Sequence, residues 1–268
     1  MRTLYFILFI LFFSEGFAQG KIDGFYNQTG TGNAVLGFGF EDSKNYRAGR
    51  REIDLGRSVY YANVYTNYGV SNNFTASLSF PYIVSDDQRN FQDISLMLKY
   101  RILQMEKKSG MLEVSLAGGV STPMSNYDLG GLNDIGQQAT VIESRAMVHY
   151  QKSNRWFATL QSGFSLKLEE VPSSVPVTLK IGRAMARWYY DVYYDFQYTF
   201  GGIDYRGTPR PQNFREFGTD FHKVGGSVYR RFSDAFGGYI SLAYTLAGRN
   251  VFVGASYGLG LVYQFDTN

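Results

Sequence analysis

The chain has 268 residues, no cysteine, and two histidines, His149 and His222. Its 26 Lys and Arg residues nearly balance its 23 Asp and Glu residues, which gives a formal net charge of +3. This balance does not indicate a nucleic-acid partner, which a strongly basic chain would. The lack of cysteine excludes a disulfide framework, a thiolate metal site and a cysteine nucleophile. Two histidines are too few for a His-rich metal site, so the composition predicts no metal and no cofactor.

The N-terminus has the layout of a secretory signal peptide. Arg2 precedes the short apolar run 4–13, and the small residues Gly16 and Ala18 follow it. The run is too short to span a bilayer well, and cleavage is expected after Ala18. Because Gln19 and not cysteine follows, a lipid-anchored N-terminus is not expected. Residues 1–18 are therefore predicted to be a signal peptide, the alternative being a buried N-terminal helix.

Residues 19–33 are polar and contain one aromatic pair, Phe25 and Tyr26. A segment of this composition cannot form a core of its own. Fifteen residues can extend about 50 Å at most, which is enough to enter a barrel from the periplasmic side. Two interpretations stay open: a disordered periplasmic tail, or a small plug.

From residue 34 to the C-terminus, apolar and polar residues alternate with period two, as expected for β-strands with two different faces. In the segment 93–102, for example, Leu96 and Leu98 lie on one face, and Lys99 and Arg101 lie on the other. The predicted strands are 34–41, 59–68, 74–82, 93–102, 111–121, 140–150, 156–168, 175–181, 188–200, 222–231, 236–246 and 251–265. About twelve such strands, an even number, predict an all-β fold: a transmembrane antiparallel up-and-down β-barrel over residues 34–268.

The connections alternate in length. Short turns are predicted at 70–73, 106–109, 151–154 and 232–235, and longer polar loops at about 42–56, 83–91, 123–137 and 202–219. Short turns at one end and long loops at the other are typical of outer-membrane barrels, which carry their long loops outside.

Charge decides which face meets lipid. A single Arg or Lys at the bilayer midplane costs about 2–4 kcal/mol, so the apolar face is expected outside and the charged face inside. A water-soluble barrel or sandwich would show the same alternation with the faces reversed. Aromatic residues near the strand ends favour the membrane alternative, because they match interfacial girdles.

The charged and tyrosine side chains of the inner face are the candidates for lining the lumen and contacting a solute. They are Tyr61, Tyr65, Lys99, Arg101, Glu113, Glu143, Arg145, His149, Lys180, Tyr189, Asp191, Tyr193 and Asp195. Hairpin pairing is expected to bring Arg101 near Glu113, and Lys180 near Asp191. These charges either form a selective constriction or serve as structural ion pairs. The tyrosines either offer a stacking surface or fill space.

Catalytic machinery is not indicated. Neither histidine has a serine two residues on, on its own strand face, and no GxSxG motif is present. No catalytic residue is therefore predicted, and the chain is not expected to be an enzyme.

The last predicted strand resembles the terminal signal by which outer-membrane proteins are recognised for insertion. The residues that carry the resemblance are Tyr257, Leu259, Leu261, Tyr263 and Phe265. The resemblance implies the barrel-assembly machinery as a partner. The chain differs from that pattern in ending three residues after Phe265.

Residues 57–123 resemble the outer-membrane transporter family named for the meta-pathway of phenol degradation. The matching pieces are Tyr68-Gly69-Val70-Ser71-Asn72-Asn73-Phe74, Leu78-Ser79-Phe80-Pro81-Tyr82, Asp93-Ile94-Ser95-Leu96-Met97-Leu98-Lys99-Tyr100-Arg101 and Gly118-Gly119-Val120-Ser121-Thr122-Pro123. Met124 and Ser125 depart from the Gly-rich continuation expected there. The resemblance implies an outer-membrane barrel that passes small hydrophobic or aromatic compounds.

These observations predict an integral protein of a Gram-negative outer membrane, in contact with outer-membrane lipid after signal-peptide removal. The expected function is a channel or transporter for passive uptake of a small solute of hydrophobic or aromatic character. The alternative is a structural or adhesive barrel whose lumen is blocked.

Overall fold

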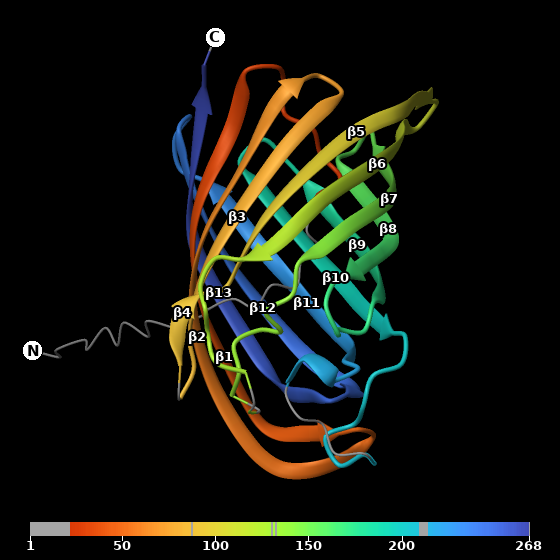
Figure 1. Ribbon diagram of the computed structural model, residues 1–268. Coiled ribbons are helices and arrows are strands. Elements are labelled where there is room, and N and C mark those ends of the chain that lie inside the picture. Colours follow the sequence, from red (N-terminus) through yellow and green to blue (C-terminus); the bar gives the residue numbers. More distant parts are fainter. Residues whose placement is uncertain (1–21, 87, 130, 132, 209–213, 268) are drawn as a thin grey trace, which may run out of the picture.

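The computed structural model describes residues 22–267, except 87, 130, 132 and 209–213. The predicted signal peptide, residues 1–18, lies outside the described residues. Figure 1 shows a single antiparallel β-barrel. Its strands are β1 (Thr31–Ala48), β2 (Arg51–Ser71), β3 (Phe74–Val84), β4 (Arg89–Phe91), β5 (Asp93–Lys107), β6 (Gly110–Pro123), β7 (Val141–Lys152), β8 (Trp156–Lys167), β9 (Ser174–Ala184), β10 (Trp188–Thr199), β11 (Asp220–Arg231), β12 (Phe236–Arg249) and β13 (Val251–Asp266).

The barrel closes because the first strand pairs with the last. β1 lies between β2 and β13, with registers that run from Thr31↔Asp266 to Arg47↔Val251 along the β1–β13 seam. The short strand β4 pairs with β3 alone, so the ring itself has twelve strands. The predicted twelve-stranded up-and-down barrel is confirmed. β1 begins at Thr31, three residues before the predicted start of the barrel at residue 34.

The two ends of the barrel differ. At the end where β1 starts and β13 finishes, here called the terminal end, the turns cover only 72–73, 108–109, 153–155, 185–187 and 232–235. The opposite end, here called the loop end, carries the long connections 124–140 and 200–219. In Figure 1 the terminal end is at the top. Among the described residues the one helix is the three-residue 3₁₀ turn Phe214–Glu216, so no helix there is long enough to cross a membrane.

The predicted loop over residues 42–56 is wrong. β1 and β2 continue through it as a long hairpin with its turn at residues 49–50. A β-bulge between Ser43 and Asn45 shifts the register, so the period-two pattern changes phase and looks interrupted in the sequence. The hairpin is held at its tip by Tyr46, which is 1% exposed and packs 4.7 Å from the ring of Phe252.

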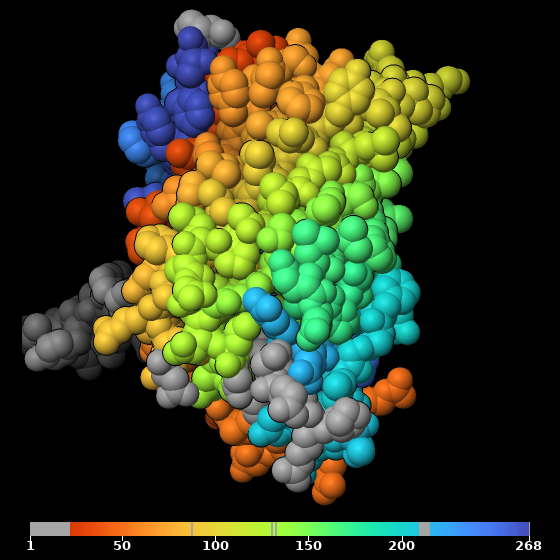
Figure 2. All heavy atoms as spheres, in the orientation of Figure 1, coloured from red at the N-terminus to blue at the C-terminus, as the bar shows by residue number. Residues whose placement is uncertain are grey.

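Apolar side chains face outward and charged side chains face inward, the reverse of a soluble protein. Val192 is 65% exposed and Leu242 53%, whereas the lumenal Lys99 and Glu143 are 4% and 3% exposed. In Figure 2 the side chains of neighbouring strands meet over most of the visible wall. This arrangement lets the chain present a continuous apolar band outside while its polar groups remain inside.

Candidate functional site: the barrel lumen

All of the predicted lumen candidates lie on the inner face, where each is buried or half-buried. Strand pleating places them there, because residues two apart on one strand point to the same side of the wall. The lumen is therefore lined as the alternation predicts. Most of the candidates fall into ion pairs, an aromatic stack and separate tyrosines, whereas Lys99 binds the segment that precedes β1 and Asp195 is buried on β10.

Ion pairs connect much of the charged wall. Arg101 and Glu113 form a salt bridge, and Lys180 Nζ lies 3.9 Å from Asp191 Oδ2, as the hairpin pairings suggest. A further pair joins Glu143 and Arg145 on β7 at 2.5 Å. All six side chains are at most 12% exposed. In each pair the two opposite charges compensate one another, so these buried charges need no bound solute to be stable in a narrow polar lumen.

The tyrosine candidates do not form one continuous surface. Tyr61 packs against the Val59 and Ile83 cluster toward the loop end. Tyr193 packs against Ala243 across the lumenal side of β11. Tyr189 stacks on Phe157 at 5.5 Å and donates a hydrogen bond to Asp191. A single stacking track along the barrel is therefore not what the structure shows.

The segment from Ile22 to Gly30 runs inside the barrel before β1 begins. Ile22 is 3% exposed and clusters with three lumenal side chains, Met97, Ala117 and Met147. Its carbonyl oxygen accepts a hydrogen bond from Gln161 Nε2 at 3.2 Å. An apolar side chain in the middle of a polar lumen anchors this segment by burial.

The next residues bind β5 and a group of lumenal rings. The Lys99 ammonium donates hydrogen bonds to the carbonyl oxygens of Asp23 and Phe25, each at 2.6 Å. The Phe25 ring packs edge-on against His149 at 4.7 Å and Phe157 at 5.0 Å. Lys99 thus holds the backbone of Phe25, and the rings of His149 and Phe157 hold its side chain.

Tyr26 is held by a different set of groups. Its hydroxyl donates to Ser115 Oγ at 2.7 Å, and its ring lies 4.0 Å from Lys99 Nζ and 4.6 Å from the Arg101 guanidinium. Burial raises the pKa of Tyr26 above its ordinary value, so the hydroxyl stays protonated and remains a donor. Asn27 then bonds Asn67 on β2 at 2.5 Å, which leads the chain into the wall.

Gly24 allows the close approach of this segment to the wall. A Cβ atom at this position would overlap the His149 ring and lie 2.8 Å from Thr159 Oγ1. His149 Nδ1 and Thr159 Oγ1 already share a hydrogen bond of 2.7 Å, so neither can move without loss. Glycine is therefore required here by space.

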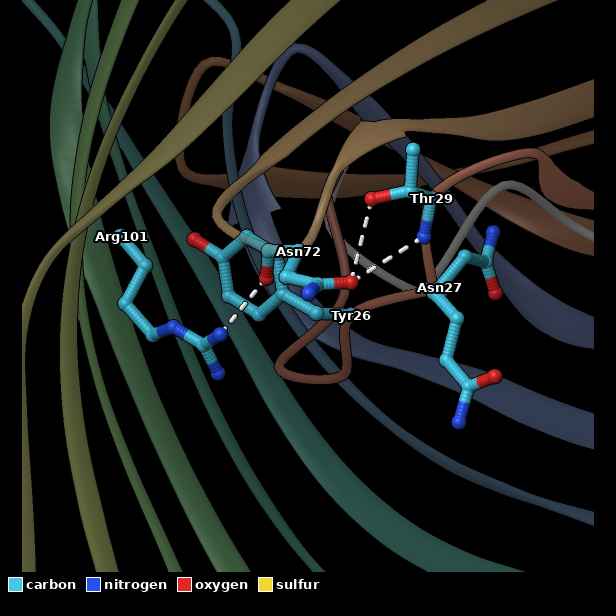
Figure 3. Close-up of a pocket in the computed structure, with 6 residues that line it drawn as sticks. Tyr26, Asn27, Thr29, Asn72 and Arg101 are labelled. Carbon is cyan, nitrogen blue, oxygen red and sulfur yellow. Dashed lines mark hydrogen bonds between the residues drawn. The ribbon is translucent and has the colours of Figure 1, made fainter.

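A cavity of 480 Å³ opens at the terminal end, beside the segment. Figure 3 shows Tyr26, Asn27, Thr29, Asn72 and Arg101 around it. Asn72 accepts from Thr29 N at 3.2 Å and its carbonyl oxygen accepts from Arg101 at 2.6 Å. The mouth is thus formed partly by the segment and partly by the β2–β3 turn. A second cavity, of 340 Å³, lies at the loop end near Pro172 and Ile203.

The connections at the loop end bind one another. Tyr127 donates to Asp93 at 2.8 Å and accepts from the Gln138 backbone at 2.9 Å. Burial, followed by the nearby Asp93 carboxylate, raises the pKa of Tyr127. Arg215 donates to the carbonyl oxygens of Gln137 and Gln138, which connects the two long loops.

Sequence reasoning missed several lumenal residues that bind the segment. They are Met97, Ser115, Met147, Phe157, Thr159 and Gln161. Strand parity was the signal that could have found them, since Phe157, Thr159 and Gln161 share the inner face of β8 with Ser165. These side chains are neither charged nor tyrosines, so the residue types that mark a lumenal candidate in the sequence do not include them.

The fold is shared with solved outer-membrane channels. The COG4313 outer membrane channel from Pseudomonas putida F1 superimposes with a TM-score of 0.72 at 11% identity, over 91% of this chain and 99% of that one. The NanC porin gives 0.57 at 9% identity, over 86% and 98%, and the KdgM porin gives 0.51 at 10%, over 86% and 99%. No curated protein matches the chain in sequence.

The sequence itself matches a family over residues 22–261, which includes the lumenal segment and nearly the whole barrel. That family is described as "Putative MetA-pathway of phenol degradation". The resemblance noted for residues 57–123 thus extends over most of the chain. The protein belongs to this family.

Proposed function

We propose that the protein is a channel of the outer membrane, and that it passes a small hydrophobic or aromatic solute by passive diffusion. The observation that carries the proposal is the reversed barrel: apolar side chains outside, and charged side chains such as Lys99 and Glu143 inside. Such a wall is stable only with lipid outside and a polar lumen within. The solved channels and porins that share the fold support the same function.

The character of the solute follows from the family description and from the lumen. The family is named for phenol degradation, which supports an aromatic solute. The lumen offers rings for such a solute, in particular His149, Phe157 and Tyr189. Binding and orientation within a channel require no catalytic group, and we infer no catalytic role.

We further propose that residues 22–30 plug the channel. Their contacts join them to β2, β5, β6, β7, β8 and β10, and such a segment obstructs any solute that crosses the lumen. With the plug in place, the lumen is closed between the two mouths. Opening then requires that the segment leave the barrel on the terminal side, where it joins β1.

The experiment is a conductance measurement in planar bilayers. The variant lacks residues 22–29 behind an intact signal peptide, because the wall starts at Thr31 and stays whole. We expect a higher conductance for the deletion than for the wild type. An unchanged conductance would remove the plug. Exchanging Gln28, whose side chain is exposed, for serine gives a control that keeps the length of the segment and the Phe25, Tyr26 and Asn27 contacts.

The second candidate function is a structural or adhesive barrel with a blocked lumen. The observation that favours it is the network of the loops, in which Arg215 bonds the backbone of the other long loop. Rigid outer loops suit a binding surface. A deletion variant that stays impermeable to small solutes in liposome-swelling assays would favour this function over the channel.

A further inference from the structure

Phe25 supplies both a ring and an oxygen atom to one place in the lumen. The ring lies edge-on to three others, at 4.7 Å from His149, 5.0 Å from Phe157 and 6.1 Å from Tyr189, with interplanar angles of 68°, 80° and 76°. The carbonyl oxygen of the same residue accepts a hydrogen bond from Lys99 Nζ at 2.6 Å. Phe25 thus fills an aromatic pocket with its ring and accepts a hydrogen bond from the Lys99 ammonium with its carbonyl oxygen.

The three wall rings are held in position by contacts of their own. His149 stacks on Phe157 at 5.7 Å and 29°, and Phe157 stacks on Tyr189 at 5.5 Å and 21°. The outer members of this row are fixed by hydrogen bonds: His149 and Thr159 share one of 2.7 Å, and Tyr189 donates one of 2.6 Å to Asp191. A pocket that is ordered before its occupant arrives binds with a smaller entropic cost.

Lys99 loses two hydrogen-bond acceptors when the segment leaves. The side chain is 4% exposed, and its ammonium donates to two carbonyl oxygens of the segment, those of Asp23 and Phe25. The segment itself covers this ammonium, because the Tyr26 ring lies 4.0 Å from Nζ, so release of the segment leaves these donors open to water or to a solute oxygen. The ammonium already makes charge-assisted hydrogen bonds to the two carbonyls, and a carboxylate would replace them with an ion pair in which the acceptor is charged as well, which is the stronger interaction.

We propose that this place is the solute site of the channel, and that Phe25 occupies it as an internal ligand in the closed state. The inference rests on the proposed function and names the class of solute. Between its ring and its carbonyl carbon, Phe25 has two carbons, Cβ and Cα. The matching free molecule is an aromatic ring joined by a two-carbon chain to a carboxylate, of which 3-phenylpropanoate is the simplest example.

Solute and plug then exclude one another. The solute ring takes the position of the Phe25 ring, and its carboxylate takes the Lys99 ammonium from the segment. Binding one occupant favours release of the other, because both cannot contact the same groups. The solute itself therefore opens the channel.

Binding is measured by calorimetry on detergent-solubilised protein. The probes are 3-phenylpropanoate, 3-cyclohexylpropanoate, which lacks the aromatic ring, and 3-phenylpropan-1-ol, which lacks the charge. We expect the variant without residues 22–29 to bind 3-phenylpropanoate at least about tenfold more tightly than the wild type, because no internal competitor remains. The other two probes are expected to bind at least about tenfold more weakly than 3-phenylpropanoate in that variant.

Two point variants test the contacts separately. Gly24→Ala adds one methyl group against His149 and leaves the wall unchanged, so it is expected to raise affinity in the same direction as the deletion. In the deletion background, Lys99→Met is expected to lower affinity about tenfold, whereas the matched Lys107→Met, on the exposed end of the same strand, is expected to leave it unchanged. Phe157→Leu supplies a second loss of affinity should Lys99→Met fail to fold.

The possible outcomes distinguish a failure of the proposed solute site from a failure of the proposed channel function. Equal affinity for the phenyl and cyclohexyl probes, or an unchanged affinity in both Lys99→Met and Phe157→Leu, overturns the site. A deletion variant that conducts ions and fails to discriminate among the probes overturns the site and keeps the channel. Tight, ring-dependent and charge-dependent binding without any conductance keeps the site and overturns the channel.

Discussion

The two halves of the lumenal wall are built from side chains of different size. From β5 to β10 the inner positions include long or aromatic side chains that bind residues 22–26, such as Lys99, Phe157 and Gln161. From β11 through β13 to β1 many inner positions are small, and a few tyrosines lie among them; the small ones are Gly37, Gly225, Ser227, Ser241, Ala243, Ser256, Gly258 and Gly260. Long side chains can reach an occupant of the lumen, and small ones leave room beside it.

Tyrosines lie across the small-residue half. A Cβ atom on Gly37 or on Gly260 would come within 2.6 Å of the Tyr239 side chain. The register places Tyr239, Gly260 and Gly37 in one row on three adjacent strands. The ring therefore lies against the backbone of the two glycines. Glycine on this side of the barrel therefore makes space for a flat tyrosine ring, whereas the strands on the opposite side bind the segment of residues 22–26.

The largest expected effect comes from breaking a charge pair on the binding half. Glu143→Ala leaves the buried Arg145 guanidinium without its carboxylate, 2.5 Å away in the wild type. Removing one partner of a buried pair costs about 3–5 kcal/mol. Urea unfolding in lipid vesicles measures the loss. Glu106→Ala at the exposed end of β5 is the matched control, and an equal effect of both variants would contradict a binding wall with its charges inside.

The second effect tests which face of that wall is inside. Leu96→Arg puts a charge on the lipid side of β5, and about 2–4 kcal/mol of stability should be lost. Lys99→Ala on the opposite face of the strand should cost the barrel less, since it removes a charge from the lumen. Heat-modifiable mobility on gels reports folding of both. The reverse order of effects would show that the faces are assigned wrongly.

The third effect belongs to the small-residue half. Gly260→Ala forces the Tyr239 ring off the wall and into the lumen, at a cost of about 1–3 kcal/mol for overpacking. The ring should also narrow the path, so the variant without residues 22–29 should conduct less when it carries Gly260→Ala. Adding Tyr239→Ala to Gly260→Ala should restore conductance. A double variant as poorly conducting as Gly260→Ala alone would mean that the glycine serves another purpose.

The sequence predicts the strands of the barrel wall better than it predicts the segment and the site inside the lumen. Period-two alternation locates the strands, and hairpin register brings Arg101 to Glu113, because both follow from local backbone geometry. The bulge at Ser43 and Asn45 breaks that regularity, so the sequence pattern predicts a loop where the structure has the β1–β2 hairpin.

The site inside the barrel depends on strands that are not neighbours. Phe25 meets Lys99 on β5 and Tyr189 on β10, and no local pattern records that these two strands face each other across the lumen. Composition indicates that residues 19–33 cannot form a core alone, which leaves both a loose tail and a plug open. The choice between them rests on the burial of Ile22 and on the close approach of Gly24 to His149. The alternation of apolar and polar residues predicts neither of these contacts.

The smallest expected effect concerns one hydroxyl of the segment. Tyr26→Phe keeps the ring between Lys99 and Arg101 and removes only the hydrogen bond to Ser115, 2.7 Å long in the wild type. A bond of this kind contributes about 0.5–1.5 kcal/mol, which corresponds to a roughly two- to tenfold rise in the ratio of open to closed channels. Single-channel recording measures this ratio as open probability.

Ser115→Ala should produce the same rise, and combining it with Tyr26→Phe should add little, because both variants remove one interaction. The barrel itself should unfold at the same urea concentration in all three, since the hydroxyl touches the wall through Ser115 alone among the contacts described. A lower unfolding midpoint with an unchanged open probability would make Tyr26 a structural part of the wall. That result would move the boundary between plug and barrel from Thr31 to a position before Tyr26.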